Sequence, residues 1–166
     1  MISINGALLP FRSVAGQFFS PLAKLLAMNP LVPRFLTWRA SNPATVERLI
    51  RNTGSNISVD ELRRYQRLFQ TERHVAAAMG MMANWDLFAF EKRLGQLDTP
   101  LVLIAGSADR AVPAEDAFKV CDLVQNGKVR VLRGLGHLAH EERPDLVTEI
   151  VLETARLMPP SVRATA

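Results

Sequence analysis

Asp109 and His137 are the two residues of this sequence whose types and settings could do chemistry together. Each follows a short apolar run and lies in a glycine-containing segment, Gly-x-x-Asp-x-x-Val-Pro in one case and Gly-Leu-Gly-His in the other. A carboxylate can hold an imidazole in one tautomer and stabilise the imidazolium that forms when histidine takes a proton from a nucleophile. Taken singly, the aspartate could instead close a turn, and the histidine could simply be hydrogen-bonded in its loop. The two together, after successive apolar runs, predict an acid–base pair.

The apolar runs before these residues predict buried parallel strands. The first covers residues 100–106 and the second residues 129–132, and a helix opened by Pro113 separates them. A further amphipathic helix is predicted from Pro144 to Leu157. The order strand, helix, strand, helix indicates a parallel βαβ arrangement and an α/β fold. Because ligand-binding loops of such sheets gather at the carboxyl ends of the strands, the loops of Asp109 and His137 are expected to meet.

The first ten residues predict a third strand. Ile2–Ile4 alternates apolar and polar residues and stops at the turn signal Asn5-Gly6. A lone strand is not stable, so this strand must join the sheet formed by the later ones. The predicted organisation is a core strand in residues 1–10, a helical region in 11–95, a βαβα part in 96–158 and a flexible tail in 159–166.

The helical region is interrupted by prolines. Its first apolar residues recur at helical spacing and are followed by expected helix breaks at Pro30 and Pro33. Further helices are predicted to start at Pro43, at Ser58 and near Glu72. Glu61 follows Ser58 by three residues, which is the spacing of a capping box.

Length and composition are those of an ordinary globular protein. The chain has 166 residues, of which 48% are hydrophobic and 22% charged, so it is not an intrinsically disordered chain. No charge-free stretch approaches the roughly 20 residues of a transmembrane helix, and no signal peptide is recognised. The single cysteine, Cys121, cannot form an internal disulfide, and a reducing, cytoplasmic compartment is expected.

The net charge of +4 comes from dispersed arginines. No nucleic-acid-binding signature accompanies them, so no nucleic-acid partner is expected. An acidic partner protein or an anionic membrane surface stays open as an alternative.

Residues 99–157 resemble the C-terminal end of an α/β-hydrolase: a strand, Gly-x-x-Asp-x-x-Val-Pro, a crossover helix, the last strand, Gly-His and a final helix. The resemblance implies that Asp109 is the acid and His137 the base of a Ser-Asp-His triad. It also implies that residues 2–5 are the core strand before the cap and residues 11–95 a helical lid. Some family members carry the acid after that earlier strand, where this chain has Asn5-Gly6. Asp109 is therefore the better candidate for the acid.

The nucleophile of that triad is missing from the sequence. The family's nucleophile elbow has the form Gly-x-Ser-x-Gly, and no two of the nine glycines here are four positions apart. The chain is therefore expected to correspond to the second half of an α/β-hydrolase, either as a truncated fragment or with its N-terminal half supplied elsewhere. By itself it is expected to be inactive and unreactive toward a fluorophosphonate probe.

Four segments resemble one subgroup more closely. They are Ile-Asn-Gly-Ala-Leu-Leu-Pro-Phe (4–11), Asn-Pro-Leu-Val-Pro-Arg (29–34), Met-Met-Ala-Asn-Trp-Asp-Leu (81–87) and Gly-His-Leu-Ala-His-Glu-Glu-Arg-Pro (136–144). The subgroup comprises the α/β-hydrolase-like accessory proteins of magnesium chelatase in bacteriochlorophyll biosynthesis. The resemblance implies a role in pigment synthesis, with Mg-chelatase subunits and a tetrapyrrole as partners and a location in the cytoplasm or peripheral to the photosynthetic membrane.

Other residues admit two interpretations. Five apolar residues could floor a pocket for a large flat substrate, although packing alone would also explain them: Phe18, Phe19, Met79, Met82 and Trp85. His140 could suggest a metal site, but two histidines without a third ligand favour a histidine at a helix start, and no metal or other cofactor is expected. Glu141 and Glu142 are explained by the favourable field at the N-terminus of the last helix.

Two functions follow from these observations. The chain could supply the acid and base of an ester or amide hydrolase. Alternatively, it could be a non-catalytic accessory protein that binds a tetrapyrrole or the chelatase, with Asp109 and His137 as inherited geometry.

Overall fold

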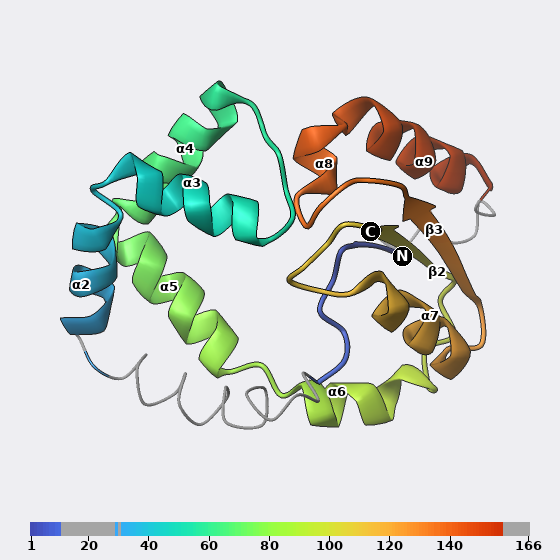
Figure 1. Cartoon of the computed structure of the whole chain (residues 1–166). Coiled ribbons are helices and arrows are strands. Elements are labelled where there is room, and N and C mark those ends of the chain that lie inside the picture. Colours follow the sequence, from blue (N-terminus) through green and yellow to red (C-terminus); the bar gives the residue numbers. More distant parts are fainter. Residues whose placement is uncertain (11–28, 30, 158–166) are drawn as a thin grey trace. The chain divides into compact units, whose positions relative to one another are not determined.

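The computed structural model (Figure 1) describes residues 1–10, 29 and 31–157. The described residues form three strands and eight helices in two compact units, and each unit is considered by itself. We call Met1–Gly6, Thr53–Asn56 and Leu97–Ala166 the sheet unit, and Ala7–Asn52 and Ile57–Gln96 the helical unit. In the described part of the chain, no helix is both long and apolar enough to cross a membrane.

The sheet confirms the predicted α/β fold class. Strands β1 (Ile2–Ile4), β2 (Leu101–Gly106) and β3 (Gly127–Leu132) are parallel and lie in the order β1-β2-β3. Ile4 is level with Ile104, and Gly106 is level with Leu132. The carboxyl ends of neighbouring strands therefore lie at one edge, as expected for the loops that carry Asp109 and His137.

Helices cover both faces of this sheet. The predicted crossover helix is α7 (Ala114–Leu123), and the last helix is α9 (Pro144–Leu157), preceded by the short α8 (Ala139–Glu142). Figure 1 shows α7 and α9 on opposite faces of the sheet. Ile104 and Leu132 pack with Val147 of α9 in one buried cluster. Burial of each large aliphatic side chain contributes about 1.5–3 kcal/mol, so these contacts fix the strands that bear the two loops.

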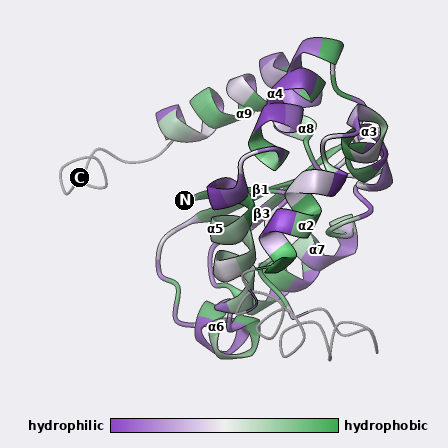
Figure 2. Ribbon diagram, turned by 90° about the vertical axis from the view of Figure 1, so that its left-hand side faces the viewer, coloured by the Kyte–Doolittle hydropathy of each residue, from purple (hydrophilic) through white to green (hydrophobic). Residues whose placement is uncertain are grey.

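The helical unit contains α2 (Leu31–Arg39), α3 (Pro43–Asn52), α4 (Val59–Phe69), α5 (Glu72–Ala83) and α6 (Leu87–Leu94). The predicted capping box is present, because Ser58 Oγ accepts from the Glu61 N–H at 3.3 Å and the Ser58 N–H donates to Glu61 Oε2 at 2.9 Å. Figure 2 shows hydrophilic and hydrophobic residues alternating along the helices, as surface helices require.

The expected break at Pro33 is wrong. Pro33 is the third residue of α2, and its side chain is buried. A proline in the first turn of a helix removes an N–H that has no intrahelical partner, so the helix continues through it. Pro30, the other expected break, lies outside the described residues.

One short segment between two helices of the helical unit belongs to the sheet unit. It is Thr53–Asn56, which lies between the end of α3 and the start of α4. We call this segment the strap. Gly54 of the strap has φ +84°, and a Cβ built on it would lie 1.9 Å from the Ala108 carbonyl oxygen. Only glycine combines this backbone conformation with so close an approach.

Replacement of Gly54 should therefore destabilise the protein strongly. Gly54→Ala adds both the strain of a positive φ and a clash with backbone, and we expect a loss of more than about 2 kcal/mol in the free energy of unfolding. The matched control is Gly80→Ala in α5, where an added Cβ meets nothing within 4 Å. That variant should gain about 0.5–1 kcal/mol because alanine favours the helix. Urea unfolding of both variants measures the difference, and equal stabilities would contradict the packing of the strap.

Candidate active site

Asp109 lies in the turn after β2, and its side chain is fully buried. Its Oδ1 accepts two backbone N–H groups, those of Ala111 and Val112, each at 2.8 Å. Its Oδ2 lies 2.9 Å from Nδ1 of His137. A buried carboxylate is costly unless its oxygens are hydrogen-bonded, and these three contacts satisfy both of them. The turn therefore presents one carboxylate oxygen in a fixed direction.

His137 lies in the loop between β3 and α8. The contacts of Asp109 assign the imidazole tautomer, because a carboxylate whose other oxygen is already occupied by N–H groups needs a donor at Oδ2. Nδ1 is therefore the donor, and in the neutral imidazole this leaves the lone pair on Nε2. The His137 side chain is 32% exposed, whereas that of Asp109 is not exposed at all. A neutral imidazole with its lone pair on an accessible Nε2 is the state that a general base requires before it accepts a proton.

The strap joins the two loops, a role that no motif in the sequence predicts. The Thr53 carbonyl oxygen accepts from the Arg110 N–H at 3.1 Å and from the His137 N–H at 3.4 Å. Ser55 Oγ accepts from the Leu138 N–H at 2.9 Å. One carbonyl thus holds both Arg110, the residue after Asp109, and His137. The only sequence signal was a run of small, turn-forming residues, Thr-Gly-Ser-Asn, between two helices.

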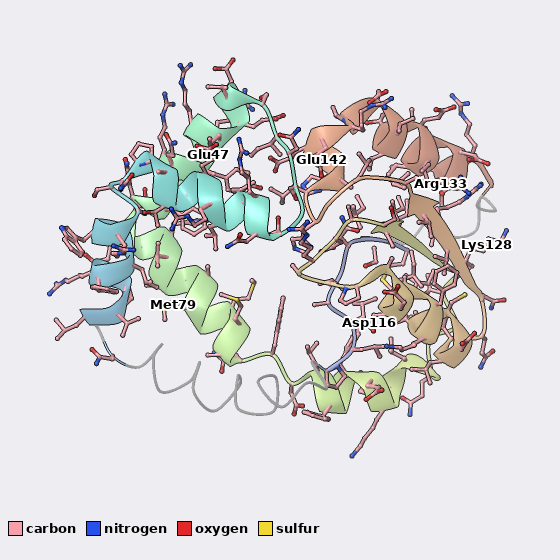
Figure 3. All side chains as sticks on the ribbon, viewed as in Figure 1. Glu47, Met79, Asp116, Lys128, Arg133 and Glu142 are labelled. Atoms are coloured by element: carbon pink, nitrogen blue, oxygen red, sulfur yellow. The ribbon has the colours of Figure 1, made fainter. Side chains whose placement is uncertain are left out.

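Glu142 anchors the same region from the other side. Its Oε1 accepts from the Gly136 N–H at 2.7 Å, and its Oε2 accepts from the Asn56 N–H at 3.1 Å. Figure 3 shows Glu142 on α8, at the end of the His137 loop. The carboxylate therefore ties the His137 loop to the strap. The sequence predicts only a favourable electrostatic position for Glu142 near the N-terminus of the last helix.

The sequence predicts only a turn at Asn5, but in the structure this residue is buried at the end of β1. Its side chain bonds to Gly106, Gly136 and His137. The hydrogen bonds of the amide thus reach the end of β2 and the loop after β3. No pattern in the sequence signalled this, because an Asn before Gly is most often a simple turn.

None of the other predicted site residues that the structure describes makes a side-chain hydrogen bond to Asp109 or His137. His140 is exposed in α8, with Nε2 at 3.5 Å from Glu141 Oε1. Met79 (labelled in Figure 3) and Met82 are half-buried on α5, and Trp85 is exposed after it. Phe18 and Phe19 lie outside the described residues. Among the residues that the structure describes, no group of three or more His, Cys, Asp or Glu side chains is arranged to hold a metal ion.

The site consists of a buried, fully hydrogen-bonded carboxylate and a partly exposed imidazole at the carboxyl edge of a parallel sheet. Such a pair can take a proton from a hydroxyl and pair the resulting imidazolium with the carboxylate. That chemistry is nucleophile activation, and it requires a hydroxyl at Nε2.

The sequence of this chain is similar to those of known proteins. Residues 3–150 match the model of the alpha/beta hydrolase family. The magnesium-chelatase 30 kDa subunit of Rhodobacter capsulatus is 33% identical over 153 residues, which cover 92% of this chain and 54% of that protein. The uncharacterized hydrolase YugF of Bacillus subtilis is 30% identical over 89 residues, which cover 54% of this chain and 33% of that protein.

Solved structures show the same fold. An esterase from Exiguobacterium antarcticum superposes with a TM-score of 0.64 at 10% identity, covering 93% of this chain and 56% of the esterase. The 2-hydroxy-6-oxo-6-phenylhexa-2,4-dienoate hydrolase of a Rhodococcus strain gives 0.62 at 16% identity, covering 93% of this chain and 54% of the hydrolase. The chain spans about half the length of the first of the curated relatives and of these solved structures. By the match over residues 3–150 and by its fold, the chain belongs to the α/β hydrolase family.

Proposed function

We propose that Asp109 and His137 are the acid and base of a Ser-His-Asp triad whose serine is not in this sequence. The observation that carries the proposal is the 2.9 Å contact between Nδ1 of His137 and Oδ2 of a buried, otherwise satisfied carboxylate. In the proposed reaction His137 takes the serine proton during attack on an ester or amide carbonyl, and then returns it to the leaving group. Asp109 orients the imidazole and stabilises it while it is charged. An oxyanion hole must also come from outside these 166 residues.

The tautomer of His137 gives a test on the chain itself. In Asp109→Asn the amide oxygen should stay with the Ala111 and Val112 N–H groups, which turns the amide NH₂ toward Nδ1 of His137. The imidazole proton must then move to Nε2, which removes the basic nitrogen. Long-range ¹H–¹⁵N spectra should report an Nδ1–H imidazole in the wild type and an Nε2–H imidazole in the variant. An Nε2–H imidazole in the wild-type chain would exclude a triad of this kind.

Catalysis is tested on the protein as it occurs in its source. A C-terminal affinity tag retains any longer polypeptide or complex that contains residues 1–166. This material should react with a fluorophosphonate and hydrolyse p-nitrophenyl esters, and His137→Ala should lower the hydrolysis rate about 10³-fold or more. His140→Ala is the matched control, because His140 is an exposed histidine of the same region. Labelling and hydrolysis that survive His137→Ala would overturn the proposal.

A second candidate is a non-catalytic accessory role in which the helical unit binds an Mg-chelatase subunit. The similarity to a protein named for magnesium chelatase supports it, and so does the surface of α2. Leu31, Phe35 and Trp38 are 62%, 57% and 67% exposed and lie at i, i+4 and i+7 on one face of this helix. The sequence of the helical unit has 12 basic and 6 acidic residues, a net charge of +6, which suits an acidic partner surface.

A tetrapyrrole ligand belongs to the same candidate function. It would lie against the predicted apolar pocket residues Phe18, Phe19, Met79, Met82 and Trp85. In this role the protein would work in the cytoplasm or at the periphery of the photosynthetic membrane.

The accessory role makes a distinct prediction. Phe35→Ser with Trp38→Ser should weaken binding to purified Mg-chelatase subunits at least about tenfold, because exposed aromatic anchors dominate such interfaces. Leu152→Ser replaces a 50% exposed apolar residue of α9; it is the control and should bind normally. His137→Ala should leave this binding unchanged. Titration calorimetry measures all three, and unaltered binding by the double variant would remove α2 as the docking surface.

A further inference from the structure

Asn5 occupies an unusual position at the end of β1. It has φ +46°, the one positive φ among the described non-glycine residues, and it is only 6% exposed. Asparagine tolerates this left-handed conformation better than most residues. Its backbone N–H still donates to the Ile104 carbonyl at 2.8 Å, so the strand pairing with β2 continues up to this residue. From this position the side chain bonds to Gly106 at the end of β2 and to the loop after β3.

The amide of Asn5 makes three hydrogen bonds in this place. Nδ2 donates to the carbonyl oxygens of Gly136 at 2.9 Å and His137 at 2.7 Å. Oδ1 accepts from the Gly106 N–H at 2.7 Å. A primary amide has two N–H donors on its nitrogen and an acceptor on its oxygen, and these three bonds use both kinds of group. The partners also fix which atom is nitrogen and which is oxygen.

The partners of Asn5 belong to both halves of the acid–base pair. Gly106 ends β2 and begins the turn that carries Asp109, while Gly136 and His137 form the loop after β3. Neither loop can shift along its strand without breaking a bond to Asn5. The side chain therefore acts on the relative position of the Asp109 carboxylate and the His137 ring, although it touches neither of them.

We propose that Asn5 is a positioning residue that sets the geometry of the Asp109–His137 pair. The proposal rests on the function proposed above, in which that pair is the acid and base. It assigns to the end of β1 a task that only an amide can perform. A carboxylate at this position would keep the bond to Gly106 but would present an acceptor to the carbonyl oxygens of Gly136 and His137.

Asn5→Asp is therefore the diagnostic variant, since it preserves size and shape. The readout is the hydrogen-exchange rate of the His137 Nδ1 proton, which reports how tightly Asp109 holds the ring. The variant loses the hydrogen bonds that Nδ2 donates to Gly136 and His137, which makes local opening of the loop easier. We therefore expect exchange to be about tenfold faster in the variant. Asn126→Asp makes the same chemical change at an exposed position of the same unit and should leave exchange as in the wild type.

A second control distinguishes the positioning role of Asn5 from a general contribution to the stability of the fold. Leu101→Val weakens the buried core at the opposite end of β2, far along the strand from Gly106. If this variant accelerates exchange of the Nδ1 proton as much as Asn5→Asp at equal thermal stability, the positioning role is overturned. The role is also overturned if folded Asn5→Asp exchanges like the wild type.

If Asn5→Asp does not fold, the wild-type chain still decides the matter. The side-chain NH₂ protons of Asn5 should then exchange much more slowly than those of Asn126, and equal rates would overturn the proposal. These measurements do not depend on catalysis. Loss of activity in Asn5→Asp, together with full activity in His137→Ala, would instead indicate failure of the proposed function.

Discussion

The hydrogen bond between Asp109 and His137 is the interaction on which the arrangement of this edge of the sheet depends. Asp109 is a charged group with no exposed side-chain surface, and its two oxygens receive three hydrogen bonds. Removal of the His137 ring would leave Oδ2 of this buried carboxylate without its donor, which is more costly than the bond itself is stabilising. The turn of residues 109–112 and the ring of His137 must therefore be placed together. The register of β2 and β3 brings them to one edge, but register alone does not fix their separation.

That separation is set by groups that come from other parts of the chain. The Thr53 carbonyl bonds to Arg110 and His137, and Glu142 bonds to Gly136 and to the strap. Asn5 bonds to Gly106 and to the loop that carries His137. Most of the bonded atoms are backbone N–H and C=O groups at strand ends, where the sheet ladder no longer supplies partners. Satisfying these groups and positioning the acid–base pair are thus the same structural task. This explains why a four-residue segment between two helices of the helical unit packs with the sheet unit.

The sequence predicted those features that depend on local pattern. Two apolar runs and the alternating segment Ile2–Ile4 predicted the three strands, and the spacing of Ser58 and Glu61 predicted a capping box. These features depend on residues close in the chain. The break at Pro33 was wrong because tolerance of proline depends on where the helix starts, which the pattern left open. The roles of Thr53, Ser55 and Glu142 could not be predicted, since each depends on contacts with residues more distant in the sequence or on backbone atoms. Asn5 and Gly136, for example, are 131 positions apart.

The same network explains why a buried carboxylate follows β2 and an amide follows β1. The resemblance to α/β-hydrolases allows either position, and the choice of Asp109 rested on the absence of a carboxylate at residues 5 and 6. The structure adds a physical reason. At the end of β1 the side chain points two N–H groups at carbonyl oxygens, and an ionised carboxylate there would face both oxygens without a proton between them. At the end of β2 the backbone presents N–H groups instead, from Ala111 and Val112. An anion is stable where donors converge, so the backbone of each turn determines which strand end can carry a buried carboxylate.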